Sequence, residues 1–330
     1  MKLLAGDIGG TKTNLAVFDS EVSLHDPMVE ETFRSAAYPS LEALVEDFVT
    51  HVDDQTFDAA AFGVAGPVVS GVARITNLPW VMSEEHLERE LEIERVRLIN
   101  DLAAIAYAVP HLQPDDLHVL NEGRPEPGGA VAVIAPGTGL GEAFCTVVDT
   151  QFVAHPSEGG HADFAPTNDV EIALLDYLHE KYDHVSYERI CSGMGLPNVY
   201  DFFKETGRYE EPSWLAEALA DADDPTPLIV ETALDEAKDC PICEATLQVF
   251  VSVLGSEAGN MALTVLATGG VYLGGGIPPR ILKALKSSTF LDSFLRKGRL
   301  SHLLAPIPVY VIMNAKAPLM GAAHRGANKV

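Results

Sequence analysis

Short apolar runs alternate with amphipathic stretches along most of the chain. The first apolar run covers residues 2–8, and after a Gly-Gly-Thr turn a second run, rich in β-forming residues, covers 14–18. Two such runs around a short glycine turn predict a β-hairpin. In the stretch that follows, Leu41, Leu44, Val45 and Phe48 recur at helical spacing behind Ser40. Serine is a preferred N-cap residue, so a helix is expected to begin there.

The same alternation continues through the first third of the chain. Residues 58–68 (DAAAFGVAGPV) are typical of a buried strand that ends in a glycine turn. Residues 94–101 (ERVRLIND) predict a strand that leads directly into an apolar helix over 102–109. Strands that alternate with helices predict an α/β fold.

The opening pattern returns at residue 130. Residues 130–149 (AVAVIAPGTGLGEAFCTVVD) again give an apolar strand, a glycine–threonine turn and a second apolar strand. The repeat indicates two similar lobes. The second copy has Ala135-Pro136 where the first has Asp7-Ile8, so only the first turn carries a carboxylate.

Helices dominate the middle of the chain, and the pattern predicts them at 169–182, about 195–205, 212–220, 227–238 and 242–267. A short strand into a triple-glycine turn follows at 269–281, and a strand, a turn and a small-residue helix lie within 307–327. The longest apolar run, 245–267, has a membrane span as the alternative interpretation. Glu257 and several uncharged polar residues interrupt it, and a mid-span charge is costly, so a buried helix is favoured. Gly255 and Gly259 would let another element approach that helix closely.

The composition narrows the possible partners. The chain has 330 residues and a formal net charge of −26, from 48 acidic and 22 basic residues. This charge argues against a nucleic-acid partner and against a polybasic membrane patch. A bound polyphosphate must therefore be held by backbone N–H groups and a metal ion. No signal peptide is recognisable and only four cysteines are present, so a reducing cytoplasm is expected.

Three glycine turns are candidates for phosphate binding, because glycine leaves backbone N–H groups accessible. They are Gly9-Gly10-Thr11, Gly137-Thr138-Gly139 and Gly274-Gly275-Gly276. None fits the P-loop pattern. The second turn has Glu142 where a dinucleotide-binding loop requires its third glycine, so another architecture is needed.

Two aspartates follow predicted strands. Asp7 precedes the first turn, and Asp101 stands between a strand and a helix, beside Asn100. Phosphoryl transfer needs a divalent metal and a base for the acceptor's proton, and two acids at strand ends could divide these roles. The alternatives stay open: Asp7 as a turn-stabilising side chain, and Asp101 as part of an Asn-Asp helix cap.

The stretch 155–164 (HPSEGGHADF) offers hydrogen-bond acceptors and a donor that suit a polyol. The alternative is a surface turn whose histidine satisfies the backbone. Glu158 and His161 alone do not complete a metal site, and Cys240 and Cys243 form half a zinc motif without a partner pair. We interpret the two cysteines as a structural or incidental pair, so no structural zinc is expected.

The ordered set of motifs resembles the bacterial glucokinase family, the ATP-dependent, non-zinc group of the hexokinase–actin–Hsp70 superfamily. The motifs are DIGGTKTNLAVFD (7–19), TNLPW (76–80), LINDLAAIA (98–106), PGTGLG (136–141), SEGGHADF (157–164), YERICSGMGL (187–196) and GGVYLGGGI (269–277). Related repressors and kinases carry a cysteine-rich zinc loop after their histidine motif. Here no cysteine follows His161 until residue 191.

The resemblance implies a fold and a set of site residues. The fold would be α/β, with two actin-like (ribonuclease H-like) lobes and a cleft between them: a small lobe of residues 1–110 plus 303–330 and a large lobe of 111–302. Asp101 would be the catalytic base, and Asp7 would steer Mg²⁺ through water. Sugar hydroxyls would be bound by Asn100, Asp101, Glu158, His161 and Glu188. ATP would be bound by Gly6, Asp7, Ile8, Gly9, Gly10, Thr11, Lys12, Thr13, Gly137, Thr138, Gly274, Gly275 and Gly276.

The implied activity is the ATP-dependent phosphorylation of D-glucose at O6, the first step of glycolysis, by a cytoplasmic homodimer. Three alternatives stay open. The acceptor could be another hexose or an aminosugar, it could be an acyl group, or the chain could be a non-catalytic sugar-responsive regulator. Such regulators carry a DNA-binding helix-turn-helix before the kinase-like part, whereas this chain starts with the glycine-turn hairpin.

Overall fold

The computed structural model describes residues 1–53, 56–75, 78–149 and 151–328. The first two residues of the TNLPW motif, Thr76 and Asn77, lie outside the described residues. The chain divides into two compact units. Unit 1 comprises 1–116, 143–156 and 314–330, and unit 2 comprises 117–142 and 157–313. The expected lobe boundaries, 1–110 plus 303–330 and 111–302, stay a prediction.

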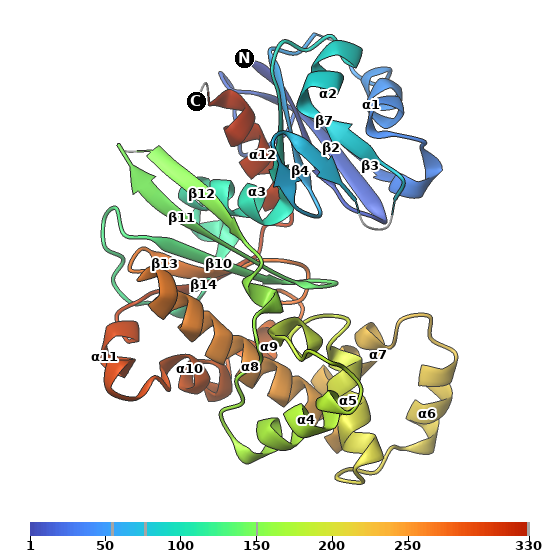
Figure 1. Ribbon diagram of the computed structural model, residues 1–330, viewed down its shortest axis with the longest axis vertical. Coiled ribbons are helices and arrows are strands. Elements are labelled where there is room, and N and C mark those ends of the chain that lie inside the picture. Colours follow the sequence, from blue (N-terminus) through green and yellow to red (C-terminus); the bar gives the residue numbers. More distant parts are fainter. Residues whose placement is uncertain (54–55, 76–77, 150, 329–330) are drawn as a thin grey trace. The chain divides into compact units, whose positions relative to one another are not determined.

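Unit 1 is built on a five-stranded sheet in the order β3-β2-β1-β4-β8 (Figure 1). Its strands are β1 (Lys2–Ile8), β2 (Lys12–Asp19), β3 (Val29–Arg34), β4 (Ala59–Val64) and β8 (Val96–Asn100). The expected hairpin is confirmed, because β1 and β2 pair antiparallel around the first glycine turn. Strands β1, β4 and β8 run parallel. A small second sheet contains β5 (Val68–Val69), β6 (Val72–Arg74) and β7 (Val81–Ser83).

The two faces of this sheet bury alternate residues of each strand. Leu4, Ile8 and Phe62 pack on one face with α1 (Leu41–Val49), whose N-cap is Ser40 as expected. Leu3 and Ala5 pack on the other face with α12 (Ala317–Ala327). Successive residues of a strand face opposite sides of the sheet. Because both sides of this sheet are covered, both sets of residues in β1 and β4 are apolar, and their apolar runs are continuous. Helices α2 (Glu84–Glu90) and α3 (Asp101–Ala108) also belong to this unit.

Unit 2 places β10 (Val131–Pro136), β13 (Gly270–Leu273) and β14 (Val309–Ile312) in parallel, with β9 (Leu117–Asn121) antiparallel at the edge. The repeat of the opening pattern is confirmed as β10, the second glycine turn and β11 (Leu140–Val148). β11 passes from unit 2 into unit 1 and is followed there by β12 (Gln151–Ser157). The 3₁₀ turns are η1 (Ser35–Ala37), η2 (Val109–His111), η3 (Pro114–Asp116), η4 (Gly159–His161), η5 (Tyr187–Arg189) and η6 (Gly298–Leu300).

All five helices predicted in the middle of the chain are confirmed, with ends that differ by a few residues. They are α4 (Asp169–His179), α5 (Leu196–Glu205), α6 (Ser213–Ala220), α7 (Pro225–Leu234) and α8 (Pro241–Val265). The pattern missed the shorter α9 (Leu282–Leu285), α10 (Ser288–Leu295) and α11 (Ser301–Leu304). Within the described part of the chain, no helix combines the length and apolarity that crossing a membrane requires. All four cysteines are buried free thiols.

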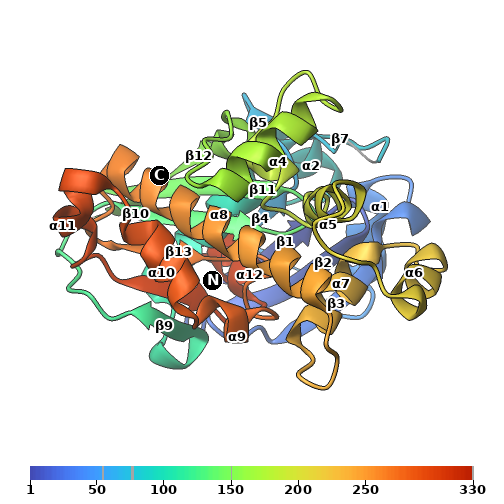
Figure 2. The same cartoon turned by 90° about the horizontal axis from the view of Figure 1, so that it is seen from below.

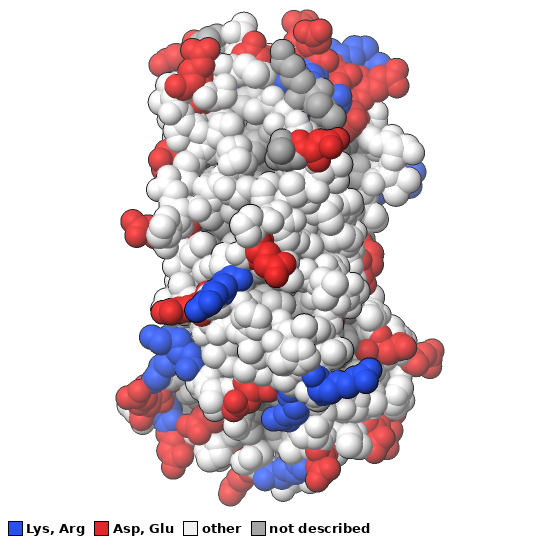
Figure 3. All heavy atoms as spheres, turned by 90° about the vertical axis from the view of Figure 1, so that its left-hand side faces the viewer, with Lys and Arg blue, Asp and Glu red and all other residues white. Residues whose placement is uncertain are grey.

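The long helix α8 lies side by side with α10 in both ribbon views (Figures 1 and 2). A Cβ at Gly255 would lie 2.3 Å from the carbonyl oxygen of Phe290, and one at Gly259 would lie 2.5 Å from that of Phe294. The expected close approach to α8 is therefore confirmed, and its partner is the backbone of α10. On the surface, acidic side chains are scattered with Lys and Arg among them on the face that Figure 3 shows.

Replacing Gly255 with alanine tests this contact. Alanine raises helix propensity by about 1 kcal/mol relative to glycine, but its Cβ meets a backbone oxygen that moves only if α10 moves. Overpacking costs about 1–3 kcal/mol, and an approach of 2.3 Å to a backbone atom belongs to the upper part of that range, so we expect a net loss of about 1–2 kcal/mol in urea unfolding. The exposed Gln248 of the same helix gives the control. Gln248→Ala should stay within about 0.5 kcal/mol, and an equal effect of the two substitutions would contradict the packing argument.

Candidate functional site

The first glycine turn, in unit 1, is closed by its own backbone and fastened by Ser35. Gly9 N–H donates to the Lys12 carbonyl at 3.0 Å. The Ser35 hydroxyl donates to the Gly9 carbonyl at 2.7 Å and lies 3.0 Å from the Thr13 hydroxyl. The Thr11 and Lys12 side chains are exposed, whereas Gly6, Ile8 and Thr13 are buried beneath the turn. The predicted nucleotide-binding set thus divides into an exposed tip and a buried support.

The Asp7 carboxylate lies at the foot of this turn. Its Oδ2 accepts a hydrogen bond from Asn14 Nδ2 at 3.3 Å. Burial raises the pKa of Asp7, and the Asn14 hydrogen bond opposes that rise. A partly buried carboxylate with one weak donor gains electrostatic stabilisation from a nearby cation. Among the described residues no cluster of three or more His, Cys, Asp or Glu could hold a metal. Asp7 alone could give a magnesium ion one carboxylate contact, and the other ligands of such an ion would have to be phosphate oxygens and water.

Asp7 and Asp101 lie on either side of Gly63. Gly63 of β4 is the direct partner of Asp7 in the parallel sheet. A Cβ at Gly63 would lie 3.7 Å from the Cα of Asp101 and 3.1 Å from the Cβ of Ala104. Asp7 is thus on β1 and Asp101 directly follows β8, and β4 separates these two strands with a residue that has no side chain at Gly63. Gly63 is not among the predicted site residues, although the glycine in AFGVAG was the available signal.

Asn100 caps helix α3. Its Oδ1 accepts hydrogen bonds from Leu102 N at 2.9 Å and Ala103 N at 3.2 Å, and its Nδ2 donates to the Gly66 carbonyl. The alternative interpretation, a helix cap formed by the Asn-Asp pair, therefore applies to Asn100. Both the oxygen and the nitrogen of its side-chain amide make hydrogen bonds to the backbone. Asp101 is the first helical residue, and its Oδ1 also accepts from Leu102 N at 2.9 Å.

In unit 2, the second and third glycine turns lie against each other. Gly274 N–H donates to the Ile134 carbonyl at 2.9 Å, and a Cβ at Gly275, whose φ is +80°, would lie 2.6 Å from the Pro136 carbonyl oxygen. Only glycine fits this close approach. The carbonyls of Gly137 and Thr138 accept hydrogen bonds from Gly193 and Met194.

A pocket of about 490 Å³ opens between these turns. Gly137, Thr138 and Gly276 line it, and a Cβ at Gly137 or Gly276 would meet no described atom within 4 Å. Bare backbone at two places on one wall lets a ligand approach the N–H groups. The other polar residues of the wall were not predicted from the sequence; they are Asp224, Thr226, Glu231 and Arg280. Thr226 and Glu231 lie in α7, Asp224 is its N-cap, and Arg280 lies in the turn before α9. The sequence pattern predicted only a helix in the first segment and only a glycine turn in the second.

Glu188 joins the second turn to the loop that carries Glu158 and His161 (loop 157–163). Its Oε2 accepts a hydrogen bond from Leu140 N at 2.9 Å, and a Cβ at Gly139 would lie 2.4 Å from the same oxygen. Its Oε1 lies 3.9 Å from His161 Nδ1. The side chains of Glu158 and His161 are exposed. Three of the predicted hydroxyl-binding residues, from two segments, thus gather beside the second turn.

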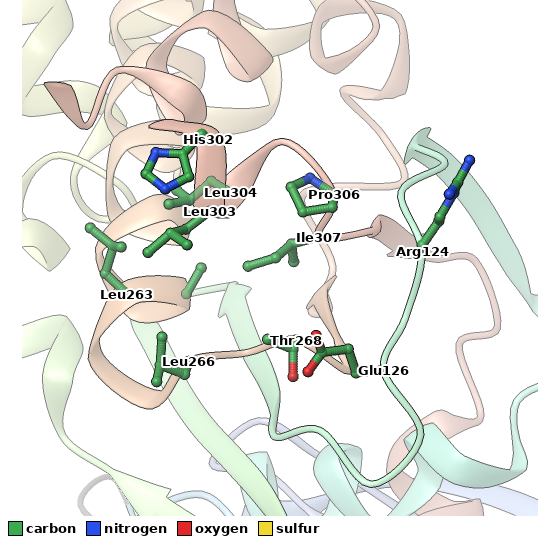
Figure 4. Close-up of a pocket in the computed structure, with 11 residues that line it drawn as sticks. Arg124, Glu126, Leu263, Leu266, Thr268, His302, Leu303, Leu304, Pro306 and Ile307 are labelled. Atoms are coloured by element: carbon green, nitrogen blue, oxygen red, sulfur yellow. The ribbon is translucent and has the colours of Figure 1, made fainter. Parts of the chain in front are cut away.

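A second pocket in unit 2 has different chemistry. It measures about 160 Å³, and leucines from α8 and α11 form much of its wall, together with Pro306 and Ile307. Figure 4 shows the Arg124 side chain directed away from the other residues. None of the predicted site residues lines this pocket.

The chain is similar to known glucokinases over nearly its whole length. The glucokinase family model matches residues 4–329. A glucokinase of Nostoc punctiforme is 42% identical over 97% of both chains, and one of Cronobacter sakazakii is 37% identical over 97% of this chain and 95% of its own. A glucokinase crystal structure from an Antarctic psychrotroph superposes with a TM-score of 0.81, is 32% identical and covers 99% of both chains.

A more distant structure shares the fold alone. A ROK family glucokinase from Streptomyces griseus, solved with glucose and AMPPNP, superposes with a TM-score of 0.63 at 19% identity over 99% of both chains. The expected fold class, α/β with two actin-like lobes, is confirmed. The resemblance to bacterial glucokinases is confirmed as well. The chain belongs to the glucokinase family.

Proposed function

We propose that this chain transfers the γ-phosphoryl group of ATP to O6 of D-glucose, giving ADP and glucose 6-phosphate. One observation carries the proposal: the Glu188 carboxylate contacts both the second glycine turn and His161. A phosphate donor held at that turn and a sugar held by loop 157–163 would therefore be neighbours. The names of the related proteins, glucokinases at 34–42% identity, support the same substrates.

The nucleotide is assigned to the glycine turns and to the 490 Å³ pocket. Gly137, Thr138 and Gly274 to Gly276 offer backbone there, while unit 1 offers the tip of the first turn, Gly9 to Lys12. With 22 basic residues against 48 acidic ones, the chain has few cations for binding phosphate, and oriented backbone N–H groups supply the favourable field instead. Gly6, Ile8 and Thr13 support the turn from beneath.

The sugar is assigned to Glu158, His161 and Glu188, with Asp101 as the base. A carboxylate at the first position of a helix is stabilised in its ionised form by the helix N-terminus. In that form Asp101 orients and accepts the proton of the sugar 6-hydroxyl. Asn100 holds the start of α3 in place through its two cap hydrogen bonds and so positions Asp101, and it stays in the proposed hydroxyl-binding set.

Magnesium is assigned to Asp7, through water. When bound, Mg²⁺ neutralises charge on the phosphates. This chain contributes the Asp7 carboxylate. Burial raises the pKa of Asp7, and a nearby cation would favour its ionised form. A homodimer, a cytoplasmic location, a role in glycolysis and the absence of nucleic-acid and membrane partners are part of the same proposal.

A substrate panel tests the activity. ADP formation is measured with glucose, mannose, fructose, N-acetylglucosamine and acetate as acceptors. We expect glucose to give the highest kcat/KM. A higher value for an aminosugar or for acetate would instead support the alternative acceptors. Specific DNA binding at low salt without any ADP formation would favour the regulator.

Asp101→Asn tests the base. Proton abstraction by a positioned group contributes about 10²- to 10⁴-fold, so kcat should fall by that factor while the KM for glucose changes by less. The matched control is Asp169→Asn, because Asp169 is also the first residue of a helix and also follows a capping asparagine, Asn168. Both variants lose a helix-end charge, but only the first should lose turnover. Near-parental turnover in Asp101→Asn would remove the base assignment.

Asp7→Asn separates function from stability. The folded-state pKa of Asp7 is raised, so the ionised form costs stability at any pH above its unfolded value, and the neutral amide removes this cost. In urea unfolding at pH 7.5 the variant should be at least as stable as the parent. Outer-shell ligands contribute about 10- to 100-fold, so the Mg²⁺ concentration for half-maximal activity should rise by that factor. An unchanged Mg²⁺ dependence would contradict the assignment.

A further inference from the structure

Two carboxyl side chains that the mechanism does not use are buried together in unit 2. Glu142 of β11 is 2% exposed and Glu257 of α8 is 6% exposed. Each is hydrogen-bonded to the other. Two carboxylates can share a hydrogen bond only if one carries the proton, and two adjacent buried charges of the same sign are strongly unfavourable.

The surrounding donors favour the ionised form of Glu257. Its Oε2 accepts a hydrogen bond from Asn260 Nδ2 at 2.9 Å, and its carboxylate also receives one from the Tyr187 hydroxyl. Glu142, in contrast, has a buried Oε1 with no hydrogen-bond partner among the described residues. No donor compensates a negative charge on Glu142 Oε1, so we place the shared proton on Glu142. Burial and the Glu257 charge raise the pKa of Glu142 to about 8.

The other titratable groups around the pair do not change this balance. Burial raises the pKa values of Tyr187 and Cys191, so both stay neutral. Lys297 is the cation of the cluster, and its Nζ donates to the Ser256 carbonyl at 2.8 Å and to Asn260 Oδ1 at 2.6 Å. Burial lowers its pKa and Glu257 raises it. One cation offsets one carboxylate, which leaves a second charge on Glu142 uncompensated.

The pair lies directly beneath loop 157–163. A Cβ at Gly159 would lie 2.0 Å from Glu142 Oε2, and one at Gly160 would lie 2.1 Å from the Leu140 carbonyl oxygen. The backbone of the loop therefore rests on the Glu142 side chain and on the start of β11. Gly159 is the neighbour of Glu158 in the chain and lies two residues before His161. A shift of the Glu142 carboxyl would be passed to both side chains through this contact.

We propose that Glu142 is a positioning residue for the sugar-binding loop: protonated and hydrogen-bonded to Glu257, it supports the Gly159 backbone and so keeps Glu158 and His161 in place. Its ionisation releases one proton to solvent and leaves two carboxylates that repel each other. The loop then loses its support and glucose affinity falls at alkaline pH. This inference rests on the proposed function, because it assigns glucose to the loop.

The test compares glucose KM between pH 6 and 9.5 in the parent and in Glu142→Gln (E142Q). The parent's KM should rise through pH 8 by roughly tenfold, the factor that corresponds to a coupling of one pKa unit. The glutamine donates to Glu257 at every pH, so KM in E142Q should stay flat. Glu171→Gln is the matched control, since Glu171 is also a buried glutamate of unit 2, bonded to Thr167 and Ser252 instead. It should keep the parental profile.

Superimposable profiles in the parent and E142Q would overturn the inference while leaving the proposed function intact. If glucose is not phosphorylated by the parent at all, the proposed function fails instead. If E142Q does not fold, Glu257→Gln decides: it removes the charge that raises the pKa of Glu142, so the rise in KM should move to lower pH. An unchanged profile in that variant would also overturn the inference.

Unfolding gives a readout that needs no activity. Because the pKa of Glu142 is raised in the folded state, the folded protein binds a proton that the unfolded chain has lost between about pH 4.5 and about pH 8. The parent should therefore lose stability relative to E142Q as pH rises across this window, and the difference should level off above it. A constant difference across the window would show that Glu142 holds no extra proton.

Discussion

The parallel register of β1, β4 and β8 is the constraint on which the chemistry of unit 1 depends. Neighbouring strands lie about 4.8 Å apart, so the ends of β1 and β8 are about 10 Å apart across β4. Gly63 occupies the middle position between Asp7 and Asp101, and any larger residue there would contact Ala104 and fill the space between the two acids. A one-residue slip of β4 would move Gly63 away and turn its neighbours to the opposite face. The separation of the two carboxylates is therefore set by backbone pairing, which is more rigid than any side-chain contact.

In unit 2, close contacts to glycine backbone, and not strand ends, set the positions of the candidate site residues. Glu188 can reach Leu140 N only because Gly139 has no side chain, and the third turn can pack on Pro136 only because Gly275 has none. The same reasoning applies to Gly159 and Gly160 above Glu142 and Leu140. Each of these glycines gives up chain entropy on folding, which costs about 0.5–1 kcal/mol. In return, the second and third turns meet around one pocket, where Arg280 is the basic side chain of the wall, and loop 157–163 packs on the start of β11.

Much of this architecture could be predicted from the sequence, because local signals determine it. The two hairpins follow from glycine turns between β-rich runs, and the five longer helices follow from apolar periodicity. Helices α9 and α11 have four residues each, too few for a period of 3.6 to show. The predicted hydroxyl-binding and phosphate-binding residues come from motifs, and motifs do not distinguish exposed from buried members. Ile8 and Thr13 belong to the same motif as Thr11, yet they are buried. The Glu142–Glu257 pair joins positions 115 residues apart, and nothing local to either residue signals the other.

The two Asn-Asp pairs, Asn100-Asp101 and Asn168-Asp169, show that local capping interactions cannot identify the base. Asn100 and Asn168 cap their helices in the same way, each accepting from the N–H groups two and three residues ahead. Asp101 and Asp169 each begin the helix that follows. Capping energies would therefore be similar at the two sites, so capping alone cannot identify a base. What distinguishes Asp101 is that its helix starts directly at the end of a parallel strand, beside a glycine whose other neighbour is Asp7. The assignment of the base thus depends on tertiary position, and only the strand order β1-β4-β8 supplies it.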